Sequence, residues 1–74
     1  MPKAKKERIR INRLKAVLAE MNIAHKELAE KVGMTANSIT RICNNESQPS
    51  LMTLREIALI LDVDIRELLV ATKS

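Results

Sequence analysis

The 74-residue sequence predicts a single all-α domain, and three observations support this fold class. Hydrophobic residues make up 46% of the chain and none of its residues is aromatic, so an aliphatic core of the kind that small packed helices build is expected. Apolar residues recur at helical spacing in several segments. Thr35, Ser50 and Asp64 each precede such a segment, as N-cap residues do.

The first helix is expected from Leu14 to about Asn22, because Leu14, Val17, Leu18 and Met21 follow the i, i+3, i+4, i+7 pattern. The segment before it, "RIRIN", alternates charged and apolar residues. That alternation fits either a short strand or a frayed helix start, and two isoleucines do not decide between them.

Two short helices are expected next. One runs from about His25 to Val32, and the following one begins after Thr35, whose hydroxyl can accept hydrogen bonds from exposed amides. Ile39 and Ile42 lie on one face of the later helix and are predicted to be buried.

The turn-rich stretch "NNESQPS" separates these helices from the rest, with Asn45 as a candidate for the left-handed conformation. Ser50 is then the expected N-cap of a fourth helix. Its predicted inward-facing residues are Leu51, Leu54, Ile57, Ala58 and Leu61. Asp64 is expected to open a fifth helix through a D-x-x-E box that Glu67 completes.

Positive charge is concentrated at the start of the chain. Residues 1–15 hold seven basic residues against Glu7, whereas the remainder holds six basic and eight acidic residues. A basic arm on a weakly acidic body indicates attraction to a polyanion, with nucleic acid the leading candidate. A solubilising tail is the alternative interpretation.

Several function classes are disfavoured. No apolar run is long enough for a membrane span or forms a signal segment, so a cytoplasmic protein is expected. Cys43, the only cysteine, and His25, the only histidine, are too few for a structural zinc site and lack an orienting partner for catalysis. We therefore expect no enzyme activity, no metal, no cofactor and no small-molecule ligand. Without aromatic rings, recognition of single strands by base stacking is poorly supported.

The only glycine, Gly33, follows the apolar Val32. A steep crossing of two helices through a short turn needs one residue with positive φ at this point, and glycine adopts it without steric cost. Close packing also needs a small residue, Ala29, in the first helix and branched residues, Ile39 and Ile42, in the second. These four positions are typical of a helix-turn-helix; an ordinary helical hairpin is the alternative.

The run "NRLKAVLAEMNIAHKELAEKVGMTANSITRICNNESQPSLMTLREIALILDVDIRELL" resembles the lambda-repressor-like (Cro/phage-repressor class, XRE-type) helix-turn-helix domain. The strongest matches are "ELAEKVG", "SITRI", "QPSLMTLREIALILDVD" and "IRELL". This resemblance implies a compact five-helix fold in which helices 2 and 3 form the helix-turn-helix. It also implies a sequence-specific, double-stranded-DNA-binding transcriptional regulator whose recognition helix, about residues 35–44, enters the major groove.

The resemblance implies two sets of contact residues. The base-contacting candidates are Ala36, Asn37, Ser38, Thr40 and Arg41. The phosphate-contacting candidates are His25, Lys26, Thr35, Asn44 and Asn45, together with Lys5, Lys6, Arg8 and Arg10 of the arm. Asn37 has the chemistry to bind adenine, and Arg41 that to bind guanine. Two departures from the family are notable: Ala24-His25 replaces the usual Ser-Gln, and Glu46 stands where a basic residue is common.

The expected organisation is a flexible basic arm (1–10), a DNA-binding domain (11–70) and a frayed C-terminus (71–74). A homodimer is expected because one short helix contacts few base pairs, and Met52, Leu59, Leu69 and Val70 are candidate interface residues. Two alternatives remain open. One is an antitoxin or restriction-controller role, and the other is a protein-interaction module that keeps the fold without binding DNA.

Overall fold

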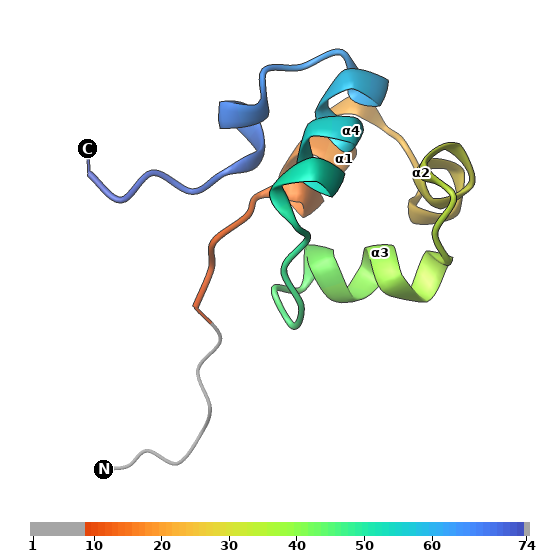
Figure 1. The fold of residues 1–74 in the computed structure, drawn as a ribbon, viewed down its shortest axis with the longest axis horizontal. Helices are drawn as coiled ribbons and strands as arrows, with labels where there is room; N and C mark the ends of the chain where they lie inside the picture. The colour runs from red at the N-terminus through yellow and green to blue at the C-terminus, as the bar shows by residue number, and fades with distance from the viewer. Residues whose placement is uncertain (1–8, 74) are drawn as a thin grey trace, which may run out of the picture.

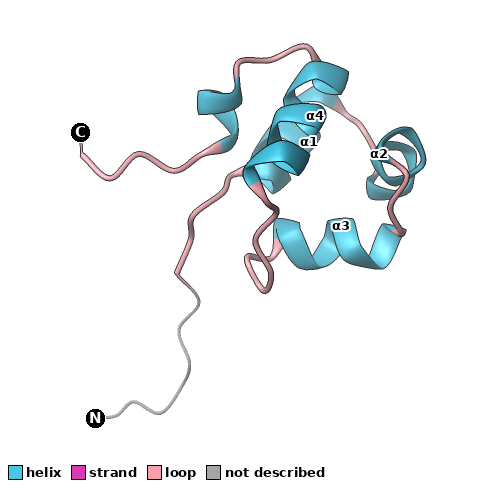
Figure 2. Ribbon diagram, viewed as in Figure 1, coloured by secondary structure: helices cyan, strands magenta, loops and turns pink. Residues whose placement is uncertain are grey.

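The computed structural model describes residues 9–73, in which four α-helices and one 3₁₀ helix surround a single core (Figures 1 and 2). The elements are α1 (Leu14–Met21), α2 (His25–Val32), α3 (Ala36–Cys43), α4 (Leu51–Leu61) and η1 (Ile65–Leu68). The all-α prediction is confirmed, although the fifth helix is one 3₁₀ turn rather than an α-helix. None of the helices described is both long and apolar enough to cross a membrane.

The helix ends follow from local sequence. Asn22, Gly33 and Asp62 end α1, α2 and α4 in the left-handed conformation, which leaves the chain free to turn sharply. Thr35 Oγ1 accepts a hydrogen bond from the Ser38 N–H (3.0 Å), and Ser50 Oγ caps α4 in the same way. The predicted caps of the third and fourth helices are therefore confirmed.

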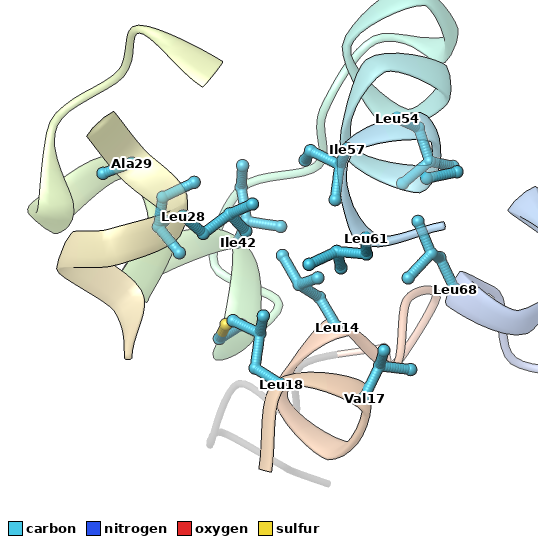
Figure 3. Close-up of a cluster of buried hydrophobic side chains, with 13 residues drawn as sticks. Leu14, Val17, Leu18, Leu28, Ala29, Ile42, Leu54, Ile57, Leu61 and Leu68 are labelled. Atoms are coloured by element: carbon cyan, nitrogen blue, oxygen red, sulfur yellow. The ribbon is translucent and has the colours of Figure 1, made fainter. Parts of the chain in front are cut away.

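The core is aliphatic and draws on every helix (Figure 3). Its buried residues are Leu14, Val17, Leu18, Leu28, Ala29, Ile39, Ile42, Cys43, Leu54, Ile57, Ala58, Leu61 and Leu68. One prediction is wrong: Leu51 is 76% exposed. It is the first residue of α4 and lies at the edge of the buried arc, where no neighbouring element covers it.

Asn12 is a buried polar residue, only 2% exposed, that joins three parts of the fold. Its Oδ1 accepts from the Leu14 N–H (3.0 Å), while its Nδ2 donates to the Ile42 carbonyl (2.9 Å) and to Gln48 Oε1 (2.8 Å). Asn12 therefore binds the first amide of α1 and ties the start of that helix to the end of α3.

The described part of the "RIRIN" segment, residues 9–12, is neither a helix start nor a regular strand. It forms one antiparallel bridge, Asn12 to Leu69, in which the Val70 N–H donates to the Ile11 carbonyl (2.8 Å) and the Arg13 N–H donates to the Leu68 carbonyl (2.9 Å). The bridge fastens the segment before α1 to the segment after η1.

Asn45 has a positive φ of 58°, as predicted. Its Oδ1 accepts from the backbone N–H groups of Ile11 (2.9 Å) and Asn12 (3.1 Å), and its Nδ2 donates to the Asn12 carbonyl (3.1 Å). The turn after α3 thus fixes where the N-terminal segment meets the domain.

Candidate nucleic-acid interface

The turn between α2 and α3 has the predicted geometry. Gly33 has a φ of +73°, and the Met34 N–H donates to the Ala29 carbonyl (2.9 Å). Ala29 is buried in α2, which packs against α3, and Ile39 and Ile42 are buried in α3. Each of the four predicted positions therefore has the burial or the backbone conformation expected of it. In Figure 1, α3 lies along one side of the molecule, with α2 above one end.

The two faces of α3 differ sharply. Ile39, Ile42 and Cys43 are buried, whereas Ala36, Asn37 and Arg41 are exposed. The predicted base-contacting face is therefore open to solvent and not covered by other described side chains. Ser38 and Thr40 are half-buried at the margins of this face.

Both marginal residues make hydrogen bonds within the protein. Thr35 Oγ1 donates to Ser38 Oγ (2.9 Å), in addition to capping α3. Thr40 Oγ1 lies 2.9 Å from His25 Nδ1 at the start of α2. These contacts orient the side chains of Ser38 and Thr40 beside the exposed face.

The N-terminus of α2 has no side-chain cap, because Ala24 occupies the N-cap position. Its first-turn amides therefore lack the hydroxyl that a serine would supply. His25 is half-buried and Lys26 is exposed at this end. Uncapped amides beside a lysine suit a phosphate oxygen.

Glu46 lies close to the C-terminal end of α3 and places a negative charge beside Arg41. Its Oε1 is 3.8 Å from Arg41 Nε, and its Oε2 accepts from Asn44 Nδ2 (3.5 Å). The Arg41 side chain is 56% exposed, so this ion pair is weak and solvent-screened. The Arg41 guanidinium therefore remains open to solvent near the C-terminal end of α3.

A basic hollow of about 320 Å³ opens at the same end of α3. It is lined by Arg10, Asn12, Arg13, Lys15, Ala16, Cys43, Asn44 and Asn45, none of which is acidic. The Arg13 guanidinium is directed partly away from the hollow, because its Nη1 donates to the Glu67 carbonyl (2.8 Å). Within residues 9–73, Arg10 and Lys15 form no ion pair, so they give the hollow its positive charge. Of the other arm candidates, Lys5, Lys6 and Arg8 lie outside the described residues.

Comparison with known proteins agrees with this geometry. The helix-turn-helix family model HTH_3 matches residues 14–68, which is most of the chain. The chain belongs to the helix-turn-helix family. This is a family of DNA-binding regulators rather than of enzymes.

The helix-turn-helix chain is also similar to a solved structure. A protein from Bacteroides fragilis, described as a candidate DNA-binding protein, shares 47% sequence identity with a TM-score of 0.79. The match covers 81% of this chain and 97% of that chain. The comparison with curated proteins gave no match.

Sequence reasoning missed two basic residues of this helix-turn-helix domain. Arg13 and Lys15 line the hollow beside Asn44, yet in the sequence they counted only as part of a general basic segment. Their position depends on the Asn12 and Asn45 hydrogen bonds, which join residues 30 and 33 positions apart in the sequence. The one available signal was their place at the start of the first helix, Arg13 just before it and Lys15 in its first turn.

Proposed function

We propose that this domain binds double-stranded DNA sequence-specifically, with α3 in the major groove, and regulates transcription. The observation that carries the proposal is the exposed polar face of α3, on which Asn37 and Arg41 stand clear of the core. Asn can pair with the N6 and N7 positions of adenine and Arg with O6 and N7 of guanine, each discriminating by about 1–3 kcal/mol. Ala36 offers a methyl contact to thymine.

Phosphate contacts would flank this face at both ends. The uncapped start of α2, with Lys26, faces one side of the groove, and the basic hollow with Arg10, Lys15 and Asn44 lies at the other end of α3. Asn45 contributes by holding the turn, because its side-chain oxygen is already shared among several donors. Such contacts set register and supply most of the salt-dependent affinity.

Two copies on adjacent half-sites are also proposed. One α-helix with three exposed contact residues covers only a few base pairs, whereas a two-fold pair on half-sites about 34 Å apart covers twice as many. The Bacteroides fragilis relative, described as a candidate DNA-binding protein, supports the DNA partner but says nothing of the assembly.

The decisive experiment is selection of bound sequences from a random duplex library with the full chain, followed by affinity measurements on the selected site. Asn37→Ala and Arg41→Ala should each weaken binding to that site by about five- to 150-fold and relax the preference at one base pair. Lys31→Ala, at the end of α2 and outside α3, is the matched control and should keep the preference.

Salt dependence separates this proposal from the interaction-module alternative. The affinity should fall steeply with salt, and the slope should shrink when residues 1–10 are removed. If no sequence is enriched and no duplex binds at low salt, the proposal fails and a protein-interaction role is favoured.

A further inference from the structure

The outer face of α4 carries more apolar surface than a monomer needs. Leu51 is 76% exposed, Met52 68%, Leu59 62% and Ile60 37%, and no described element covers them. Exposed apolar residues grouped on one helix are typical of a protein–protein contact rather than of a free surface.

The outer face of α4 has an apolar centre with one positive and one negative side chain on either side of it. At about 100° per residue, Met52 and Leu59 fall within about 20° of each other and directly opposite the buried residues of α4. Arg55 and Glu56 lie about 50° to either side of this Met52–Leu59 line. Both are exposed, and within the described residues neither forms an ion pair.

This arrangement distinguishes between the two ways of pairing α4 with a copy of itself. A parallel pair, with the two-fold axis running along the helices, brings each Arg55 opposite the Glu56 of the other copy, on both sides of a Met52–Leu59 seam. An antiparallel pair instead places Arg55 opposite Arg55 and Glu56 opposite Glu56, which is repulsive. Charge complementarity therefore selects a second copy of this chain, in parallel orientation.

We propose that α4 pairs in parallel with α4 of a second copy through Met52, Leu59, Arg55 and Glu56. Figure 1 shows that α4 starts near the C-terminal end of α3 and runs away from it. A parallel pair therefore leaves both α3 helices at the same end of the dimer. The pairing itself stands independently of DNA binding, but its use in placing two copies on one operator rests on the proposed function.

The pairing surface is small, so the free dimer belongs to the weak class of interfaces below about 1,200 Å². Sedimentation equilibrium of the full chain should therefore cover about 10 µM to about 1 mM. Arg55→Glu should weaken self-association about tenfold, because two attractive contacts become repulsive. Arg55→Glu with Glu56→Arg should restore it, since the exchange recreates both contacts.

Lys31→Glu on α2 makes the same charge change away from α4 and should leave self-association unchanged. Circular dichroism and the urea midpoint of each variant exclude misfolding as the cause of a loss. A chain that stays monomeric at about 1 mM, or a double variant that does not recover, overturns the pairing. If Arg55→Glu self-associates as strongly as the parent chain, the result points to the antiparallel arrangement and also overturns the proposed parallel pairing. Binding of each variant to a single half-site is measured separately, so failure of DNA recognition is distinguishable from failure of pairing.

Discussion

His25 Nδ1 lies 2.9 Å from Thr40 Oγ1, so the first residue of α2 is joined directly to the middle of α3. Both residues were predicted DNA contacts, one for a phosphate and one for a base. Their hydrogen bond joins the N-terminus of α2 to α3 beside the exposed face of α3. A histidine in place of the glutamine common in the family thus keeps a polar side chain that reaches across to α3.

Replacing Thr40 with valine tests this bond, because valine keeps the branched shape and removes Oγ1. Thr40→Val should lower the free energy of unfolding by about 1 kcal/mol, the usual worth of one hydrogen bond. Thr40→Ser retains the hydroxyl and is the matched control. Urea unfolding measures both; equal stability of the two variants would show that the bond contributes nothing.

Asn12 should be among the most sensitive positions in the chain. Asn12→Ala leaves the Leu14 N–H, the Ile42 carbonyl and Gln48 without this partner, and we expect a loss of about 2–3 kcal/mol in the free energy of unfolding. Gln48→Ala, at an exposed member of the same network, should cost less than about 1 kcal/mol. The prediction is contradicted if denaturant titration gives the two variants the same midpoint.

Substitution of Gly33 tests the cost of its backbone conformation alone, because a Cβ added there would meet no atom within 4 Å. With φ at +73°, Gly33→Ala should cost about 1–2 kcal/mol of unfolding free energy. Gly33→Asn should cost less, because asparagine tolerates the left-handed region better. A cost for alanine well above this range would indicate a close contact in place of backbone strain.

Cys43 is buried and free, and burial raises the pKa of its thiol, although nearby Lys15 lowers it in part. The thiol should therefore stay protonated at neutral pH and react slowly with a disulfide reagent in the native protein. Unfolding in urea should make the reaction fast. Native and unfolded protein reacting at equal rates would place Cys43 at the surface.

Asp64 gives the stability a defined dependence on pH. The Arg66 backbone N–H (2.8 Å), and then the Arg66 side chain, lower the pKa of the Asp64 carboxyl. The carboxylate therefore stabilises the fold above its unfolded pKa of about 3.9, and this contribution is lost as pH falls through the lower folded value. Asp64→Asn, which keeps capping ability, should be less stable than the parent near pH 6 and equal to it at the acid end of a pH series of thermal melts.

The helix-turn-helix itself was predictable from sequence because its determinants are local. Gly33, Thr35 and the spacing of Ile39 and Ile42 act within one turn and two short helices, and the structure confirms each of them. The start of α4 was predictable for the same reason, because its N-cap Ser50 is a local signal.

What could not be predicted depends on contacts between distant segments. Periodicity does not show that Asn12 is buried, because its partners Ile42 and Gln48 belong to another part of the chain. Leu51 was misassigned because an amphipathic pattern defines an arc but not which element covers its edge. The basic hollow, formed where these segments meet, was missed for the same reason.

The bridge between Asn12 and Leu69 has a consequence for the order of folding during synthesis. Asn12 leaves the ribosome long before Leu69, so α1 emerges without the contacts that fix the segment preceding it. Final closure of the domain therefore waits for the residues after η1, and a ribosome stalled before Leu69 would hold a chain whose N-terminal segment lacks this attachment.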